Sequence, residues 1–397
     1  MAIILNKEEL ATNELRRDAL EILEAGLEAV GTEKVLKRKV RLNGESLEIE
    51  GQSFDLQSIS RMIFIGIGKC ALDGAKAIEE ILGDRLSFGA VIDDKPSSEA
   101  AGLKKIKYFE GTHPLPSEQN VAATREILKI VENLTEEDLV IALISGGGSA
   151  LFESPIEGTS LDEIIQKTKE LTARGADIYE LNAARKEMSE VKGGKFAEIC
   201  APARVVSLLL SDVLGNDISV IASGPTVLEE PTERVENILL LSNRDALCAM
   251  RSKAQELGFS ARIETEDLSG DAEEWGKSLA LRDPEPKTCI LLGGETTVKI
   301  RGDGIGGRNQ TMALSALPHM KADSVLVCAS SDGWDNTEHA GALADTELFQ
   351  KIENLNLNPQ EFLDKSDSFS FFKNAGGAIY TGKLGSNVSD LYIILYK

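Results

Sequence analysis

The chain has 397 residues, a formal net charge of −22 at pH 7 and 42% hydrophobic residues. This length predicts two domains, and the composition is typical of a water-soluble globular protein. The negative charge argues against nucleic acid or an anionic membrane as a partner, because both bind basic surfaces. No apolar run is long enough to span a bilayer, and the first ten residues lack the basic region of a secretory signal.

The cysteines and histidines exclude two further classes of protein. An odd, dispersed set of five cysteines favours reduced thiols in the cytoplasm over a disulfide framework. The three histidines lie far apart in the sequence and show no zinc-ligand spacing, so we expect no structural metal site.

The first half of the chain alternates strands and helices. Residues 6–37 have apolar positions at helical spacing and predict one long amphipathic helix. Asn43-Gly44 lies inside an alternating stretch, 40–56, and predicts a hairpin. The elements expected next are strands at 61–67, 88–92, 107–109, 139–145 and 204–211, helices at 70–82, 120–132 and 161–172, and a partly helical segment at 177–196. This alternation predicts an α/β fold, with a mostly parallel sheet that helices cover on both faces.

The second half predicts a smaller α/β lobe. The polar segment Glu229–Arg234 is the expected boundary, so we divide the chain into domains 1–230 and 231–397. Beyond the boundary we expect helices at 243–257, 269–280 and 310–317, and strands at 289–292, 324–330 and 391–396.

Small and charged residues follow the predicted strands, where open α/β sheets bind their ligands. The most distinctive segment is Leu139–Leu151, an apolar strand that stops at Ser145, Gly146, Gly147, Gly148 and Ser149. Such a turn offers bare N–H groups and hydroxyls to an anion. Other strands end in similar groups: Gly66, Gly68 and Lys69; Asp212 and Asp217; Gly293, Gly294 and Glu295; Asp332 and Asp335.

One of these turns keeps an alternative open. Gly66-Ile-Gly68-Lys-Cys-Ala71 fits the glycine pattern of dinucleotide-binding folds, and Asp93 follows the next strand at a suitable distance for a ribose-binding acid. An NAD(P)-linked reductase is therefore an alternative. The chain lacks a Walker phosphate loop and the G-x-S-x-G elbow of serine hydrolases.

Basic residues concentrate in two glycine-containing stretches of this acidic chain. Residues 182–195 include Asn182, Arg185, Lys186, Lys192 and Lys195, and residues 301–310 include Arg301, Arg308 and Asn309. The carboxylates at the strand ends are suitable oxygen ligands for Mg²⁺. Cationic groups, a backbone cradle and metal-binding carboxylates are together what phosphoryl transfer requires.

Nine segments, in order along nearly the whole chain, resemble the glycerate 2-kinase family of the MOFRL type, whose members are often labelled hydroxypyruvate reductases. These segments are GIGK (66–69), GTHPLP (111–116), LISGGGSAL (143–151), RKEMSEVKGGK (185–195), SDVLGNDISVIASGPT (211–226), LLGGETTV (291–298), GDGIGGRNQ (302–310), SDGWD (331–335) and GSNVSD (385–390).

The resemblance implies ATP- and Mg²⁺-dependent phosphorylation of D-glycerate to 2-phosphoglycerate. It further implies a Rossmann-like N-terminal domain, a smaller C-terminal MOFRL-type α/β domain and a site in the cleft between the two lobes. The implied catalytic residues are Lys69, Asp212 and Arg308; the substrate-binding residues are Ser145, Gly146, Gly147, Gly148, Ser149 and Lys192; the nucleotide-binding residues are Gly66, Gly68, Gly293, Gly294, Glu295 and Asn309; the metal ligands are Asp212 and Asp332.

The chain departs from the family pattern at three places. Glu187 stands where the family commonly has histidine, Trp334–His339 replace an aspartate-rich run, and Thr381–Ser386 replace a T-G-P-T-G-T-like turn. These departures concern substrate detail more than reaction class.

The expected partners are the small molecules glycerate and ATP, with no nucleic acid and no membrane. Whether the chain is a monomer or a homodimer stays open, as do the isomer of the product and the anion, carboxylate or phosphate, that the Ser145–Ser149 turn binds. Two alternatives remain: the NAD(P)-dependent hydroxypyruvate reductase, and a protein that senses a nucleotide or sugar acid without turnover.

Overall fold

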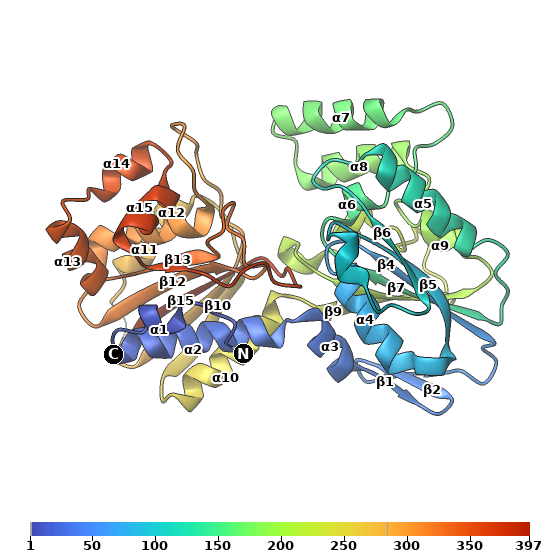
Figure 1. Ribbon diagram of the computed structural model, residues 1–397, viewed down its shortest axis with the longest axis horizontal. Coiled ribbons are helices and arrows are strands. Elements are labelled where there is room, and N and C mark those ends of the chain that lie inside the picture. Colours follow the sequence, from blue (N-terminus) through green and yellow to red (C-terminus); the bar gives the residue numbers. More distant parts are fainter. Residues whose placement is uncertain (1, 284) are drawn as a thin grey trace. The chain divides into compact units, whose positions relative to one another are not determined.

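The computed structural model describes residues 2–283 and 285–397, and the chain forms two compact units (Figure 1). The continuous unit comprises Thr32–Leu241. The split unit combines Met1–Gly31 with Ser242–Lys397. No helix in the described ranges is both long and apolar enough to cross a membrane.

The continuous unit contains the first two sheets of the chain. Its strands are β1 Val40–Asn43, β2 Ser46–Ile49, β3 Gln52–Asp55, β4 Arg61–Ile67, β5 Leu86–Asp93, β6 Ile106–Glu110, β7 Asp138–Ile144, β8 Arg204–Leu210 and β9 Val235–Leu241. Its α-helices are α3 Thr32–Lys39, α4 Ala71–Leu82, α5 Glu118–Ile130, α6 Gly148–Leu151, α7 Leu161–Ala173, α8 Ile178–Met188 and α9 Lys195–Ile199. Short 3₁₀ turns lie at Gly83–Arg85, Ser97–Ala100, Leu214–Asn216 and Ile221–Ser223.

The main sheet of this unit confirms the predicted Rossmann-like architecture. Its order is β6-β5-β4-β7-β8-β9, and every neighbouring pair is parallel. Counted along the chain, this is the 3-2-1-4-5-6 order of doubly wound sheets, in which the direction of winding reverses between the first and fourth strands. Here the reversal lies between β4 and β7, where Ile67 pairs with Ile144 at the carboxyl ends.

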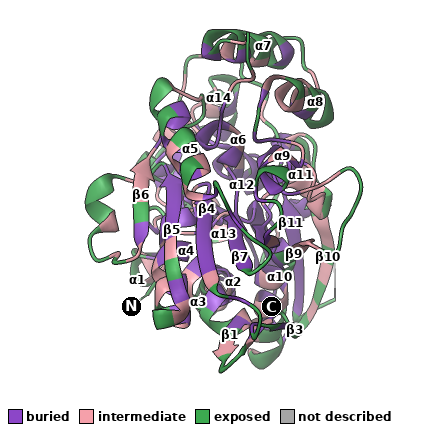
Figure 2. Cartoon of the chain, turned by 90° about the vertical axis from the view of Figure 1, so that its right-hand side faces the viewer, coloured by how far each residue is buried: buried purple, intermediate pink, exposed green. Residues whose placement is uncertain are grey.

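Helices cover both faces of this sheet because alternate strand residues face opposite sides. Ile63, Ile65 and Ile67 pack in one core with residues of α5 and α9. On the other face Gly74 of α4 lies against Leu143, and a Cβ at position 74 would overlap that leucine. β4 and β7 are buried along nearly their whole length (Figure 2).

The split unit has the second six-stranded sheet. Its strands are β10 Ser260–Leu268, β11 Thr288–Gly294, β12 Ser324–Ser330, β13 Gly341–Asp345, β14 Ala378–Ile379 and β15 Asp390–Tyr396. Its α-helices are α1 Lys7–Leu10, α2 Glu14–Ala29, α10 Asn243–Glu256, α11 Ala272–Ala280, α12 Arg308–Ala316, α13 Thr346–Asn354, α14 Pro359–Asp364 and α15 Ser368–Ala375, with a 3₁₀ turn at Leu317–His319.

This second sheet is mixed. Its order is β10-β11-β15-β12-β13-β14, with only β10 and β11 parallel. Because β15 runs antiparallel to β11 and β12, its first residue, Asp390, pairs with Gly294 and Ser330 at their ends. One face packs on α11, α12 and the three helices after β13, whereas α2 and α10 contact the other face.

The predicted single helix at 6–37 is wrong, because the structure divides this segment into α1, α2 and α3. The side chain of Asn13 caps α2 by accepting from the Arg16 N–H, and α2 ends at Ala29. Unlike the predicted division at 230/231, the structure places α1 and α2 in the same unit as the C-terminal residues.

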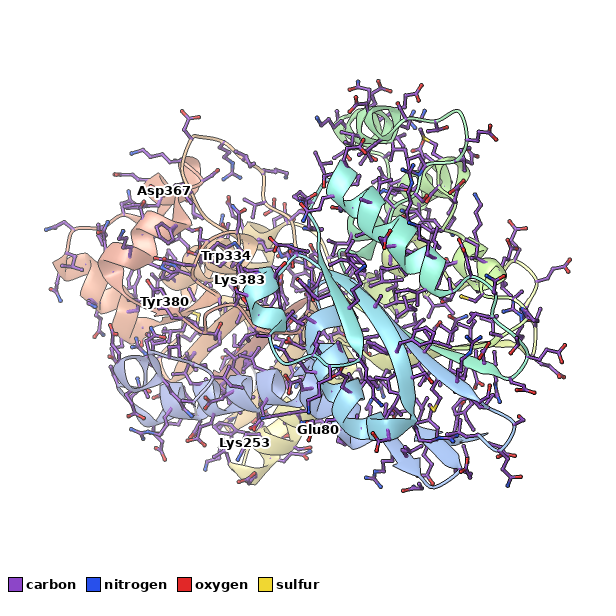
Figure 3. All side chains as sticks on the ribbon, turned by 45° about the vertical axis from the view of Figure 1, so that its right-hand side comes forward. Glu80, Lys253, Trp334, Asp367, Tyr380 and Lys383 are labelled. Carbon is purple, nitrogen blue, oxygen red and sulfur yellow. The ribbon has the colours of Figure 1, made fainter. Side chains whose placement is uncertain are left out.

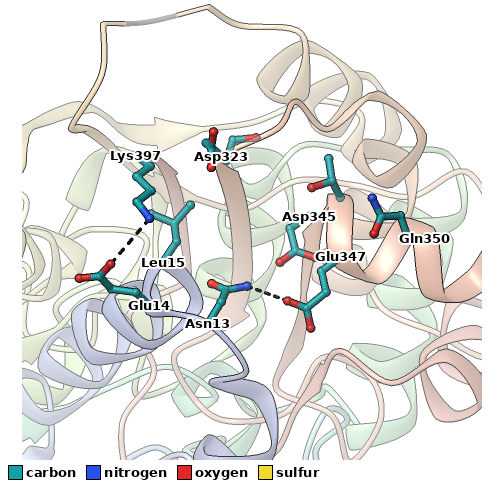
Figure 4. Close-up of a pocket in the computed structure, with 10 residues that line it drawn as sticks. Asn13, Glu14, Leu15, Asp323, Asp345, Glu347, Gln350 and Lys397 are labelled. Atoms are coloured by element: carbon teal, nitrogen blue, oxygen red, sulfur yellow. Dashed lines mark hydrogen bonds and ion pairs between the residues drawn. The ribbon is translucent and has the colours of Figure 1, made fainter.

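The first turn of α2 is tied to the end of β13. Arg16 donates two hydrogen bonds of 2.6 Å to Asp345, and both side chains are buried. A pocket of about 270 Å³ lies there, where Asn13 bonds Glu347 and Glu14 pairs with Lys397 (Figure 4). These pairs hold α2 against the C-terminal part of the split unit.

The hairpin predicted around Asn43-Gly44 is confirmed, since β1 and β2 pair antiparallel with Asn43 opposite Ser46. The sequence analysis missed β9, β10 and β13, and also the three helices between β13 and β14. β10 is the clearest case, because its sequence, SARIETEDL, is polar at this edge of the sheet.

Candidate functional site

The turn after β7, Ser145–Ser149, is joined to the turn after β4 by buried hydrogen bonds. Ser145 is 1% exposed, its N–H donates to the Ile67 carbonyl at 2.9 Å, and its Oγ accepts from the Cys70 N–H at 3.2 Å. Lys69 N–H donates to the Gly146 carbonyl at 3.0 Å. The two turns at the reversal point of the sheet therefore form one rigid structure.

Each of the three glycines in this turn allows a close approach. A Cβ at Gly146 would overlap the Asp212 carboxylate, and a Cβ at Gly148 would lie 2.6 Å from the Cβ of Ala222. Gly147 has φ +82°, and a Cβ there would lie 3.0 Å from Cγ of Lys69 and 3.3 Å from Cδ2 of His113. The structure thus brings Lys69, Asp212 and His113 around the turn.

Three groups at this turn that can bind an anion have no hydrogen-bond partner among the described residues. Lys69 is half-buried, and its ammonium makes no hydrogen bond or ion pair with the described residues. Within the same part of the chain, the N–H groups of Gly146 and Gly147 donate no hydrogen bond. Loss of hydration and the charges of Lys69 and Arg185 lower the pKa of His113 to about 4, so its ring is neutral at pH 7.

Ser149 connects the turn to α8 through a chain of side chains. Its Oγ lies 2.9 Å from Oγ of Ser223, which in turn donates to Oδ1 of Asn182 at 2.8 Å. Asn182 donates from Nδ2 to the Val220 carbonyl at 3.3 Å. Ser149 is therefore a positioning residue of the turn as well as a candidate ligand.

Lys192, assigned to substrate binding from the family resemblance, has another role in this structure. Its side chain is fully buried, and its Nζ donates to Glu153 at 2.7 Å and to the Phe152 carbonyl at 2.9 Å. Burial lowers the pKa of Lys192 despite the neighbouring carboxylate. The ammonium has no path to a ligand as long as this pair persists, so we correct its assignment to structural support.

Gly66 and Gly68, assigned to nucleotide binding, lie in close packing instead of an open loop. A Cβ at Gly66 would lie 2.5 Å from Cγ1 of Val91. At Gly68, which has φ +111°, a Cβ would overlap Ser145. Both glycines are therefore required by packing within the continuous unit, and their nucleotide-binding role stays a prediction.

Asp93 does not fit the ribose-binding role on which the dehydrogenase alternative depends. It is fully buried, and its carboxylate accepts from the Leu72 N–H at 2.9 Å and the Lys95 N–H at 3.2 Å. Burial raises the pKa of Asp93 to about 6. Its carboxylate is used to hold the first turn of α4.

The split unit has a second cluster at the ends of β11 and β12. Arg308, the first residue of α12, donates to both carboxylate oxygens of the buried Asp390 and to the exposed Glu295. The two carboxylates raise the pKa of Arg308 in spite of its burial. Arg308 is therefore enclosed by acids in this structure, unlike Lys69.

The N-terminus of α12 is capped by Asp335, which lies 25 residues further along the chain. Its buried carboxylate accepts from the N–H groups of Gln310, at 2.8 Å, and Asn309, at 3.2 Å. Burial and the charge of Asp390 raise the pKa of Asp335 to about 6. Asn309 is fully buried, and its Oδ1 has no hydrogen-bond partner among the described residues.

The other predicted residues of this unit lie at the same strand ends. Gly293 and Gly294 are buried against Asn243 and Leu268, so they pack strands and helix together. Asp332 accepts from Ser330 Oγ at 2.7 Å and from the Trp334 N–H at 2.9 Å. Both assignments, to nucleotide and to metal, stay predictions.

Two of the departures from the family pattern lie side by side. The ammonium of Lys383 is 5.1 Å from the centre of the exposed Trp334 ring (Figure 3). The Leu384 N–H also donates to the Asp332 carbonyl at 2.8 Å. The segments 334–339 and 381–386 therefore meet through the contact between Lys383 and Trp334.

No group of three or more His, Cys, Asp or Glu side chains in the described ranges is arranged to hold a metal ion. The sequence analysis missed His113 and Asp390 as site residues, although both lie in segments that it quoted, GTHPLP and GSNVSD. Neither residue has a local sequence pattern that indicates its role, because its partners are distant in the sequence and are brought close only by the folded sheet.

Comparisons with known proteins agree with this architecture. Residues 18–255 match the family model described as a domain of unknown function, DUF4147, and residues 288–390 match the MOFRL family. The D-glycerate 2-kinase of Thermotoga maritima is 36% identical, with 96% of this chain and 98% of that protein covered. The glycerate 2-kinase of Pyrococcus horikoshii is 32% identical (95% and 98% covered), and the glycerate kinase of Rattus norvegicus is 31% identical (96% and 93%).

A solved structure extends the similarity to the fold. The crystal structure of Thermotoga maritima glycerate kinase superimposes with a TM-score of 0.84 at 33% identity, covering 96% of this chain and 99% of that one. Both family models, these relatives and the sheet order lead to one conclusion: the chain belongs to the glycerate kinase family in which a DUF4147 domain is followed by a MOFRL domain.

Proposed function

We propose that this protein phosphorylates D-glycerate with ATP and Mg²⁺ and releases 2-phosphoglycerate. The observation that carries the proposal is the Ser145–Ser149 turn, in a chain of net charge −22. An ammonium and two N–H groups meet at this turn without a partner in the described ranges. The relatives named as glycerate 2-kinases support the choice of substrate and of product isomer.

In this proposal the turn binds the glycerate anion. The N–H groups of Gly146 and Gly147 donate to it, and Lys69 supplies the positive charge. The hydroxyl oxygen of glycerate attacks the terminal phosphorus of ATP while the bond between that phosphorus and ADP breaks. The hydroxyl proton passes to Asp212, whose carboxylate lies against Gly146.

The residues present fit a magnesium ion of the usual kinase kind. Mg²⁺ is typically held by one or two carboxylates, with phosphate oxygens and waters as its other ligands, so a cage of three side chains is not required. Because Asp212 is assigned the proton, Asp332 of the split unit is the proposed carboxylate ligand, and its Oδ1 is held by Ser330 and the Trp334 N–H. When bound, the ion would neutralise charge on the donor phosphates.

Arg308 is the proposed cationic group of the split unit. For Arg308 to bind a phosphate, its pair with the exposed Glu295 must open, whereas its two bonds to buried Asp390 can persist. Such an exchange replaces one anion by another at the same guanidinium, so the arginine stays paired throughout.

The test is a set of assays on the purified full chain. ADP formation from ATP is measured with D-glycerate, with L-glycerate, and with EDTA in place of Mg²⁺, and enolase reports the 2-isomer of the product. We expect ADP and enolase-dependent phosphoenolpyruvate only with D-glycerate and Mg²⁺. Oxidation of NADH on adding hydroxypyruvate, without ADP formation from glycerate, would instead support the reductase.

A further inference from the structure

The structure separates the basic residues of segment 185–195 by their partners. Lys192 is buried against Glu153, and Lys195 donates two bonds of 2.7 Å to the last carbonyls of α8 and its cap, Lys186 and Ser189. The side chain of Lys186 packs over Gly193, 3.1 Å from where a Cβ would lie. Arg185 remains: it is half-buried and makes no hydrogen bond or salt bridge with the described residues.

The position of Arg185 on α8 directs it toward the Ser145–Ser149 turn. It follows Asn182 by three residues, so the two side chains share one face of the helix. Asn182 is tied through Ser223 to Ser149, which fixes this face against the turn. Electrostatic interactions of Arg185 with His113 and with Glu153, on the two sides of the turn in the chain, agree with that placement.

We propose that Arg185 is a further substrate-binding residue, whose guanidinium pairs with the carboxylate of the hydroxy acid held at the turn. An arginine presents two parallel N–H groups that match a carboxylate, which makes it a better partner for this group than a lysine. The buried pair of Glu153 and Lys192 lies near Arg185, because the charge of Glu153 acts on the guanidinium although the two form no salt bridge.

This inference rests on the proposed function for the identity of the acid. It adds a second cation within the continuous unit: Arg185 pairs with the carboxylate, and Lys69 supplies positive charge beside Gly147 of the same turn. Loss of hydration lowers the pKa of Arg185, because burial disfavours a charged guanidinium that has no salt bridge with the described residues.

The test compares Arg185→Gln with Lys186→Gln, which removes the same charge from the next residue of the same helix. We expect Arg185→Gln to raise the KM for D-glycerate at least 10-fold, with the KM for ATP within 2-fold of the parent. Arg185→Lys should recover only part of the affinity, because it keeps the charge and loses the paired N–H groups. Lys186→Gln should leave both KM values within 2-fold.

Two measurements do not depend on turnover. Calorimetry of D-glycerate without nucleotide should show the same weakening in Arg185→Gln. Proton NMR should show a higher pKa for His113 in this variant, since the charge of Arg185 is among the causes that lower it. If turnover fails but glycerate binding weakens in Arg185→Gln, the proposed function is wrong and the assignment of Arg185 stands.

Three results would overturn the assignment: equal glycerate affinity in Arg185→Gln and Lys186→Gln, an unchanged pKa of His113, or a raised KM for ATP in place of glycerate. The last result would place a phosphate, and not the carboxylate, at Arg185.

Discussion

The two clusters at strand ends differ in whether their main cation is paired with acidic side chains. In the continuous unit, the ammonium of Lys69 lies at a glycine turn without an anionic partner in the described chain. In the split unit, the guanidinium of Arg308 is enclosed by Asp390 and Glu295. Both lie at the carboxyl ends of buried strands, so location in the fold does not explain the difference.

The difference shows what each cation does before any ligand is bound. An unpaired, half-buried charge adds no bond to the fold and is useful only when an anion binds beside it. A charge paired with a fully buried aspartate stabilises the fold, because Asp390 would otherwise be a buried, uncompensated anion. We therefore expect Lys69 to matter for activity alone, and Arg308 to matter for both activity and stability.

The largest expected effect is on catalysis by Lys69→Met. Removing a preorganised cation from the reacting groups should lower kcat/KM for D-glycerate about 10³-fold or more. The free energy of unfolding, measured with urea, should change by less than about 0.5 kcal/mol, since the ammonium makes no bond with the described residues. Lys169→Met on the exposed face of α7 is the matched control, and near-normal activity in Lys69→Met would remove Lys69 from the mechanism.

The next effect tests whether the glycine turn must stay open. In Gly146→Ala the new methyl group would overlap the Asp212 carboxylate, so the carboxylate or the turn must move. A displacement near 1 Å at such a site lowers activity about 10²-fold. Gly31→Ala is the control, because the nearest atom to its Cβ is the Glu28 carbonyl oxygen at 3.8 Å. Equal kcat/KM in both variants would show that this approach of Asp212 is not needed.

A third experiment measures stability in the split unit. Arg308→Met leaves Asp390 buried without its cation and should lower the free energy of unfolding by about 3 kcal/mol. Arg308→Met combined with Asp390→Asn should recover most of this loss, because no uncompensated charge then remains. Equal stability of Lys69→Met and Arg308→Met in urea unfolding would end the distinction between the two clusters.

Local patterns predicted much of the fold and part of the site. Buried strands such as β7 are continuous apolar runs, and the turn at Asn43-Gly44 carries its own signal, so both were found from the sequence. The break before α2 was missed because only one residue, the cap Asn13, marks it, and the apolar spacing on either side still fits a helix. β10 was missed because this edge strand is mostly polar and lacks the apolar run by which buried strands are predicted.

Roles that depend on distant partners could not be predicted. Lys192 looked like an anion ligand in a basic stretch, yet Glu153, 39 residues away, occupies its ammonium. Asp335 lies in a segment of acids and serves as the cap of α12, 25 residues earlier. In both cases the pairing is decided by the sheet that brings the segments together, and no spacing in the sequence records it.

The smallest expected effect is a pH dependence of the stability of the split unit. His339 is fully buried between Gln310, whose Oε1 lies 2.9 Å from Nδ1, and the Tyr380 hydroxyl, 2.7 Å from Nε2. Burial lowers its pKa to about 4, whereas an unfolded histidine has a pKa near 6.5. Between pH 6.5 and 4 the unfolded chain therefore binds the additional proton, so stability falls as the pH falls through this range.

Binding of this proton by the unfolded chain should lower the free energy of unfolding by about 2 kcal/mol at pH 5 relative to pH 7. The stability difference between the parent and His339→Gln, from urea unfolding, should therefore shrink by that amount from pH 7 to pH 5. Tyr380→Phe removes one hydrogen bond and keeps the titrating ring, so its difference from the parent should change much less with pH. A difference for His339→Gln that is the same at both pH values would mean that this histidine does not stay neutral in the fold, and that the stability of the split unit does not depend on its protonation.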